Sequence, residues 1–340
     1  FLNALQWDGT ERIRFCLHRF LGSDTDDYTY EALKLFLLGA ISRAFKPGCK
    51  FEVMLCLVGG QGAGKSSFFR LLAVNDDWFS DDLKKLDDEN VYRKMQGHWI
   101  IEMSEMIATA NAKSIEEIKS FLSRQKETYK IPYETHPADR KRQCVFGGSS
   151  NTLDFLPLDR TGNRRFVPVM VYPERAEVHI LADEQASREY INQMWAEAME
   201  IYRSGNFRLR FSPAMNDYLK AHQKDFMPED TKAGQILDYL ERYSGSIVCS
   251  KQLYKEALGH DYDEPKQWEL REINDIMNNA VTGWRAFSNP RYFPEPYRRQ
   301  KGWERIRNDN EPDNSMDGFQ EIPTEEMEQL GLPEEWLKQK

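Results

Sequence analysis

A glycine-rich run, GGQGAGKS at residues 59–66, constrains this chain more than any other feature of its sequence. The run matches the phosphate-binding pattern G-x-x-x-x-G-K-[ST] at every fixed position. The apolar segment 53–58 before it is typical of a buried parallel strand, and residues 67–73 after it can continue as a helix. Glycines allow the backbone N–H groups of such a loop to approach a phosphate, because a Cβ would obstruct the approach. The sequence therefore predicts nucleotide binding between a strand and a helix.

The loop and the helix after it also predict individual contacts. The positive end of the helix would face the same anion. Lys65 would reach the β- and γ-phosphates, and the Ser66 hydroxyl would ligate Mg²⁺. The predicted nucleotide-binding residues are Gly60, Gln61, Gly62, Ala63, Gly64, Lys65, Ser66 and Ser67. A plain turn between an ordinary strand and helix is the alternative reading.

Composition and charge narrow the class of protein. The chain has 340 residues, which suggests two or three domains, and its hydrophobic content of 40% suffices for a packed core. No apolar run reaches the ~20 residues of a membrane span, and we expect no signal peptide in the first residues. Because the first residue is Phe1 and not Met, we expect a fragment of a longer protein. Five scattered cysteines without a C-x-x-C pair predict a reducing cytoplasm and argue against a zinc site or disulfides.

The net charge of −9 is concentrated in one segment. Residues 308–340 hold ten acidic residues against two lysines, a net charge of −8, which leaves −1 for the other 307 residues. The acidity therefore belongs to a tail, and the body of the chain is free to carry local basic patches.

A second stretch, Gly97–Glu105, is an apolar strand that ends in acidic residues. Beside a phosphate loop, one carboxylate holds the Mg²⁺ shell and another orients or activates the attacking water. Glu102 and Glu105 both qualify for these roles. Residues 144–151 predict another buried strand, and Asn151 at its tip could sense a γ-phosphate or simply start a turn.

Basic residues mark two further segments. Residues 129–142 alternate, turn at Pro137 and end in a basic run, which predicts a hairpin. Arg164 and Arg165 precede an apolar strand at 166–171. In oligomeric ATPases an arginine from the neighbouring subunit neutralises charge in the transition state, and an ordinary surface ion pair is the alternative.

The residue pattern of the C-terminal third changes from about Ser244. Two short helices are predicted before Trp284–Arg307, where basic and aromatic residues interleave. Such a segment suits phosphate contact and base stacking, and the order of elements predicts a winged helix-turn-helix. The residues predicted to contact nucleic acid here are Arg291, Arg298, Arg299 and Lys301. A small helical domain with a solvated basic edge is the alternative.

Taken together, these stretches resemble the virulence-associated protein E family of phages and mobile elements. That family is related to superfamily 3 helicases within the AAA+ class. The resemblance covers residues 7–205, and the motifs that carry it are Trp7-Asp8-Gly9, the loop 60–66, Trp99–Glu102 with Glu105, Lys119 with Phe121, Tyr129 with Pro132-Tyr133, Phe146-Gly147 to Asn151, and Thr161–Phe166.

The resemblance implies a ring, expected to be a hexamer, with ATP and Mg²⁺ at subunit interfaces. Lys65 and Ser66 would form the Walker A motif, Glu102 and Glu105 the Walker B region, and Asn151 the first sensor. Arg164 or Arg165 would be the finger that acts in trans. The two glutamates stand three residues apart instead of consecutively, so the roles of metal shell (Glu102) and water (Glu105) are assigned with the reverse left open. DNA in the channel would be gripped by Lys130, His136, Arg140, Lys141 and Arg142.

The expected fold is an α/β protein with a P-loop AAA+ parallel-sheet core. The expected parts are an N-terminal helical region at 1–50, the ATPase core at 51–175, a helical lid or connector at 176–243, a winged-helix-like DNA-binding domain at 244–307 and the acidic tail at 308–340. The expected function is ATP-dependent DNA unwinding or translocation in the cytoplasm, without membrane contact. The alternatives are a DNA-binding initiator that uses ATP only to assemble, and a small-molecule kinase.

Overall fold

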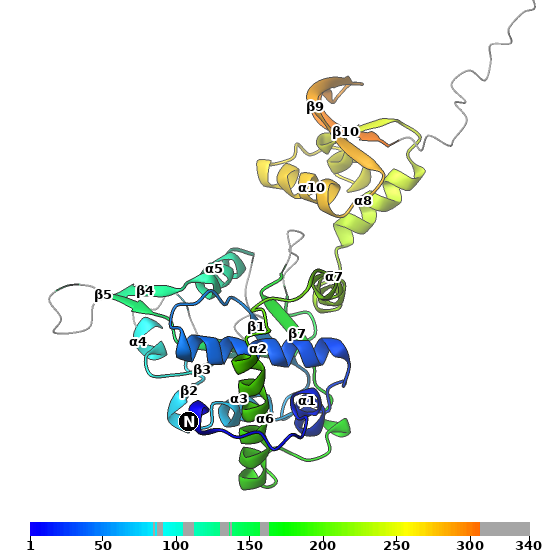
Figure 1. The fold of residues 1–340 in the computed structure, drawn as a ribbon. Helices are drawn as coiled ribbons and strands as arrows, with labels where there is room; N and C mark the ends of the chain where they lie inside the picture. Colours follow the sequence, from blue (N-terminus) through cyan, green and yellow to red (C-terminus); the bar gives the residue numbers. More distant parts are fainter. Residues whose placement is uncertain are drawn as a thin grey trace, which may run out of the picture. The chain divides into compact units, whose positions relative to one another are not determined.

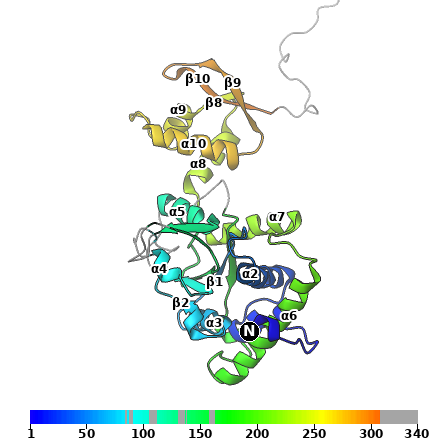
Figure 2. The ribbon, with the colours of Figure 1, turned by 60° about the vertical axis from the view of Figure 1, so that its left-hand side comes forward.

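The chain is described by a computed structural model that covers residues 1–83, 86, 91–104, 112–129, 136, 138–156 and 163–306, without the side chains of 112–114 and 129. Two compact units divide it, the first from Phe1 to Asp230 and the second from Thr231 onward. Figures 1 and 2 show the elements of both units from two sides. Each unit is described by itself.

The first unit is built on a five-stranded sheet with the order β2-β3-β6-β1-β7. Every neighbouring pair of its strands is parallel. The strands are β1 (Met54–Val58), β2 (Phe79–Ser80), β3 (Ile100–Ser104), β6 (Val145–Ser150) and β7 (Phe166–Met170). All five residues of β1 are buried, as expected for a parallel strand that has helices on both faces of its sheet.

Helices cover both faces of this sheet (Figures 1 and 2). In the first unit these are α1 (Ile13–Leu21), α2 (Asp27–Phe45), α3 (Lys65–Leu72), α4 (Val91–Met95), α5 (Ala112–Ser123), α6 (Glu184–Ser204) and α7 (Pro213–His222), with short 3₁₀ turns at Leu2–Ala4, Asp76–Trp78, Pro173–Arg175 and Gln223–Phe226. Side chains alternate along β1, so Leu55 and Leu57 join a core with α1, α2, α3 and α6. Met54 and Cys56 face the other way, into a core with α4 and α5.

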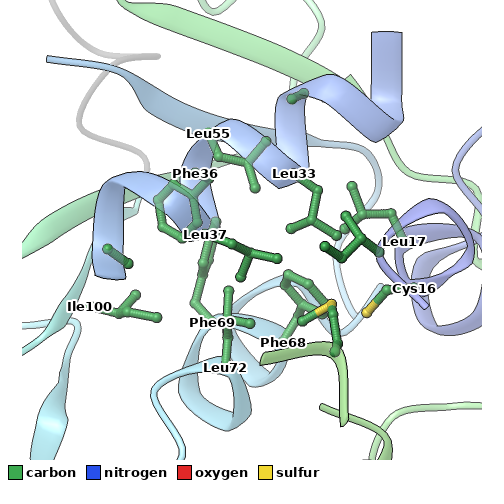
Figure 3. Packing of buried hydrophobic residues seen from close by; sticks show 14 of the residues in the cluster. Cys16, Leu17, Leu33, Phe36, Leu37, Leu55, Phe68, Phe69, Leu72 and Ile100 are labelled. Carbon is green, nitrogen blue, oxygen red and sulfur yellow. The ribbon is translucent and has the colours of Figure 1, made fainter. Parts of the chain in front are cut away.

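The N-terminal helices and α6 are part of the same core as the sheet. Figure 3 shows Leu17 of α1, Leu33 and Phe36 of α2, Leu55 of β1 and Phe68 of α3 as members of one buried cluster. The carboxylate of Glu197 in α6 accepts the backbone N–H groups of Arg12 and Ile13, at 2.6 and 2.9 Å, and so satisfies the first turn of α1. The expected part at 1–50 and residues 176–230 of the expected lid or connector therefore belong to one unit, which runs to Asp230.

A small hairpin of β4 (Lys126–Tyr129) and β5 (Ala138–Lys141) follows α5. Its strands are antiparallel, with Thr128 opposite Asp139. The hairpin predicted between residues 129 and 142 is therefore present, and its paired strands begin at Lys126.

Up to residue 306, the second unit has three helical segments and a three-stranded antiparallel sheet of order β8-β10-β9. Its elements are α8 (Thr231–Arg242), β8 (Ile247–Cys249), α9 (Ser250–Gln252) with a π-helical turn at Leu253–Ala257, α10 (Gln267–Asn279), β9 (Trp284–Phe293) and β10 (Arg298–Arg305). Ile236 and Leu240 of α8 share a core with Ile273 and Ile276 of α10. The boundary therefore lies before α8, ahead of the expected position at residue 244.

Candidate nucleotide site

Parallel strands bring the predicted site residues together near the carboxyl ends of the strands. The glycine-rich loop leaves the carboxyl end of β1, and Asn151 follows directly after β6, which pairs with β1. On the other side of β6 lies β3, whose Glu102 is in register with Gly147. Carboxyl ends of neighbouring parallel strands meet at the same edge, where ligands of open α/β sheets bind.

Two glycines of the loop have the backbone conformation that the turn requires. Gly62 and Gly64 have φ angles of +81° and +80°, which lie in the left-handed region that side chains disfavour. Gly64 is the N-cap of α3, so the helix begins at Lys65 and directs its unpaired N–H groups at the loop. This local geometry suits an anion.

The ammonium group of Lys65 lies inside the loop. Its Nζ donates hydrogen bonds to the carbonyl oxygens of Gly59 and Gly60, at 2.6 and 2.7 Å, and to Oδ1 of Asn151 at 2.9 Å. Burial lowers the pKa of Lys65, and the nearby charge of Glu102 partly offsets that shift. Lys65 and Asn151, 86 residues apart in the sequence, are thus in direct contact.

Glu102 is a buried carboxylate at the centre of the site. Its Oε1 accepts hydrogen bonds from the hydroxyl groups of Ser66 at 2.7 Å and Ser149 at 2.6 Å. Its Oε2 is buried and has no hydrogen-bond partner among the described residues. Burial raises the pKa of Glu102, and the bonds from Ser149 and Ser66 oppose that shift.

Ser149 was missed from the sequence as a site residue. It is one of two consecutive serines in β6, and the signal that identifies it is the pairing of β3 with β6, which sets Ser104 opposite Ser149. The residue that contacts Glu102 could not be chosen before the strand order was known. Of the other predicted catalytic residues, Glu105 lies outside the described part of the chain.

Arg164 and Arg165 lie at the opposite side of the sheet from the phosphate loop, at the amino-terminal ends of the strands, just before β7 begins at Phe166. Both approach Glu52, which stands before β1, at 3.2 Å for Arg164 and 3.4 Å for Arg165. Arg165 also donates to the Ser123 hydroxyl at 2.9 Å and its side chain is 21% exposed, whereas that of Arg164 is 66% exposed. Neither arginine is at the edge that holds its own phosphate loop.

The residues of the first unit that were predicted to contact DNA differ in their exposure. Lys130 lies outside the described residues, and His136 and Lys141 are exposed. Arg140 is partly buried in β5. The prediction for Arg142 is wrong, because its side chain is fully buried. It pairs with the carboxylate of Glu127 and donates to the carbonyl oxygen of Phe121 at 2.6 Å, so it anchors the hairpin.

The predicted nucleic-acid residues of the second unit all lie on the hairpin of β9 and β10. Arg291 is in β9, and Arg298, Arg299 and Lys301 are in β10. All four are exposed.

The sheet is all parallel, a phosphate-binding loop follows β1, and a buried glutamate lies two strands away on β3. These features define a P-loop α/β protein with an AAA+-type core. A family model for the Virulence-associated protein E-like domain matches residues 2–228, and the chain belongs to that family. The resemblance seen in the sequence is thereby confirmed.

Solved structures with the same fold were also found. The apo structure of the NrS-1 C terminal region (305–718) matches with a TM-score of 0.51, and the A form apo structure of the NrS-1 C terminal region with 0.53. Each match covers 90% of this chain and 78% of the other, at 13% sequence identity, which is evidence of a common fold. No curated protein sequence matches the chain. Within the described residues, no helix is long and apolar enough to cross a bilayer.

Proposed function

We propose that this chain is an ATP-driven DNA motor, a helicase or translocase used in the replication of a phage or another mobile genetic element. The observation that carries the proposal is the meeting of Lys65, Asn151 and Glu102 at one edge of the sheet. A phosphate loop, a buried acid and a polar strand tip are parts that hydrolysis of a nucleoside triphosphate uses. Such a motor would work in the bacterial cytoplasm, where the replicating DNA is.

ATP and Mg²⁺ are the proposed ligands, and the residues at the site fit both. Lys65 and the loop N–H groups would hold the phosphates. The Ser66 hydroxyl and Glu102 would hold Mg²⁺, since the buried Oε2 of Glu102 has no hydrogen-bond partner among the described residues. Bound there, Mg²⁺ would neutralise charge on the phosphate oxygens. Glu105 is the proposed residue that orients the attacking water.

Assembly into a ring, proposed as a hexamer, would complete this site. Arg164 and Arg165 precede β7, at the sheet edge opposite the phosphate loop, so neither serves the loop of its own subunit. An arginine that acts across a subunit interface must lie away from the phosphate loop of its own subunit, so that it can reach the loop of a neighbour. We assign the role to Arg164, because its side chain is 66% exposed, while Arg165 is held by Glu52 and Ser123.

DNA is the proposed substrate of the motor. The hairpin of β4 and β5 would face the ring channel, with Lys130, His136, Arg140 and Lys141 as the contacts to a single strand. Its anchor, the buried pair of Arg142 and Glu127, would transmit movement between the hairpin and the sheet.

The decisive experiment measures ATP hydrolysis by the purified protein with and without single-stranded DNA. We expect DNA to raise turnover, and Lys65→Ala to lower it about 100-fold or more, because a charge-stabilising donor is lost. Lys220→Ala is the matched control, since Lys220 is an exposed lysine on α7. The double variant Arg164→Ala with Arg165→Ala should bind ATP and fail to hydrolyse it.

The other outcomes of this experiment identify the rival functions. Turnover that is indifferent to DNA would contradict a DNA motor and favour a kinase that acts on a small molecule. Binding of both ATP and DNA without turnover would favour an initiator or regulator that uses ATP only to assemble. Hydrolysis retained by the double arginine variant would rule out the finger assignment alone.

A further inference from the structure

The second unit carries its positive charge on the β9–β10 hairpin and not on α10. The hairpin, residues 284–305, holds six basic residues and two acidic ones, a net charge of +4. Helix α10, residues 267–279, holds Arg271 against three acidic residues, a net charge of −2. In a helix-turn-helix protein the second helix usually enters the major groove, where phosphates repel negative charge. The charge distribution therefore disfavours α10 as the element closest to nucleic acid.

Four of the six hairpin cations already have partners within the unit. Arg285 and Arg291 both pair with Glu304, at 2.8 and 2.7 Å, and Arg298 pairs with Glu295 at 3.4 Å. Arg305 is bonded to backbone carbonyl oxygens of α8 and of the turn after it. These contacts hold the hairpin together, although the exposed ion pairs contribute little to stability.

The remaining two cations, Arg299 and Lys301, are both exposed residues of β10. Arg299 lies directly opposite Tyr292 in the ladder, and Lys301 follows two residues later, at a register shift between Gln300 and Gly302. Within the described chain no carboxylate lies within ion-pair distance of Arg299 or Lys301, and Arg299 donates only to the Pro290 carbonyl oxygen, at 3.3 Å. Residues opposite each other across two strands project from the same face, so Arg299 and Tyr292 form one surface.

The acidic residues of α10 are held where they are by local contacts. Glu272 pairs with Lys232 of α8 at 2.7 Å, and Glu269 accepts the backbone N–H of Lys266 at the start of the helix, also at 2.7 Å. Asp275 accepts from the Asn279 side chain at 2.7 Å. These carboxylates make contacts within α10 and with its neighbours, and their negative charge makes the helix a poor surface for phosphates.

We propose that the β9–β10 hairpin, through Arg299, Lys301 and Tyr292, is the duplex DNA-binding element of this unit, and that α10 does not enter the groove. This inference rests on the proposed function as a DNA-acting protein. A two-stranded ribbon fits the major groove of a duplex. Binding of single strands stacks successive bases on several aromatic side chains. Among the described residues of this hairpin, Tyr292 is the one exposed aromatic side chain.

The test compares two variants of the full chain that remove the same amount of charge. The hairpin variant is Arg299→Gln with Lys301→Gln, and the helix variant is Lys251→Gln with Arg271→Gln, on α9 and α10. Fluorescence anisotropy measures the affinity of each for a labelled duplex over a range of salt concentrations. We expect the hairpin variant to bind about 10-fold or more weakly near 0.1 M salt, with the slope of log K against log salt reduced by about 2.

The helix variant should bind within about 3-fold of the wild-type chain, because none of its lost charges neutralises a phosphate. An equal or larger loss in the helix variant would overturn the proposal in favour of α10. Wild-type affinity in the hairpin variant, or a loss confined to single-stranded DNA, would also overturn it. ATP hydrolysis stimulated by single-stranded DNA should persist in the hairpin variant, so failure here is distinguishable from failure of the proposed motor function.

Crosslinking gives a second, site-specific measurement. Tyr292 on the hairpin and Trp268 on α10 are both exposed aromatic residues, at 68% and 57%. The photoreactive residue p-benzoylphenylalanine at each position makes a matched pair of probes. Crosslinks to duplex DNA are expected from position 292 and not from position 268, and the reverse pattern would contradict the proposal.

Discussion

At the scale of single residues, Glu102 shows how a site residue can oppose the stability of the fold. Its carboxylate is buried on β3 and receives hydrogen bonds on one oxygen only. Burial raises the pKa of Glu102 above its ordinary value of 4.5. The charged form is therefore less favoured in the folded chain than in the unfolded chain, and ionisation of Glu102 destabilises the fold.

This shift predicts a pH dependence of stability. A carboxyl whose folded pKa is raised stabilises fully below the unfolded pKa, and that contribution is lost as the pH rises through the folded pKa. Relative to Glu102→Gln, the wild-type chain should therefore lose unfolding free energy as the pH rises from below 4.5 toward neutrality. Urea unfolding of both proteins at a series of pH values measures the difference.

Any constant effect of the new amide cancels in this comparison, since only the slope with pH is used. A pH-independent difference between the two proteins would show that Glu102 has an ordinary pKa. A slope of the opposite sign would show that the Lys65 charge outweighs burial.

The two neighbouring arginines should separate in their effects. Arg164→Ala should change the unfolding free energy by less than about 0.5 kcal/mol, because its side chain is 66% exposed. Arg165→Ala removes contacts to Glu52 and Ser123 and should cost about 1 kcal/mol. Hydrolysis and ATP binding are measured beside thermal unfolding. We expect Arg164→Ala to lose hydrolysis at unchanged stability, and the opposite assignment would follow if only Arg165→Ala did so.

At the scale of elements, the β4–β5 hairpin is fixed by a buried ion pair. Arg142 directly follows the last residue of β5 and pairs with Glu127 of β4. Its guanidinium carbon lies 4.6 and 5.1 Å from the ring centres of Phe121 and Phe146. The residue that ends the basic run of the sequence is therefore part of the core, while Lys141 beside it is exposed. Alternation along a strand sends adjacent residues to opposite faces.

Breaking this pair should be far more costly than replacing it. Arg142→Met removes the closest partner of the buried Glu127 carboxylate and leaves it only the longer pair with half-exposed Arg124, at 3.6 Å. The variant should cost about 3 kcal/mol. The double variant Arg142→Met with Glu127→Met should recover most of that loss, because both charges are gone. Urea unfolding measures both proteins. A single variant with wild-type stability but weaker DNA stimulation would show that Arg142 contacts DNA after all.

At the scale of the whole molecule, the chain divides at a defined position. Near the end of the first unit, Phe226 is buried in the same core as residues of α5. The second unit begins with α8, whose Ile236 is buried in a core with residues of α10. Units that each have a core can fold and unfold separately.

The division predicts the result of limited proteolysis. Glu229 is exposed and directly precedes in sequence the boundary after Asp230, so cleavage after glutamate should cut there early. The fragment that ends at Glu229 should retain nucleotide binding, because every described residue of the nucleotide site precedes Asn163. Mass spectrometry of the fragments and a nucleotide-binding titration check this. Resistance at Glu229, together with one unfolding transition, would show that the two units fold as one.

The sequence by itself determined the phosphate loop, the strand and helix that flank it, the apolar strand that carries Glu102, and the basic residues of the β9–β10 hairpin. Each of these depends on a local pattern, since glycines at fixed spacing and the period of apolar residues act over a few positions. The family was predicted from a resemblance carried by these and other motifs, and the parallel α/β class with it, and both are confirmed.

Only the tertiary structure decided which of these residues meet. The contact of Ser149 with Glu102, the burial of Arg142 and the different surroundings of Arg164 and Arg165 depend on strand order and register. Those are set by which faces pack together across more than a hundred residues of chain, and no short stretch of sequence specifies them. The same packing joined α1, α2 and α6 to the sheet and moved α8 into the second unit.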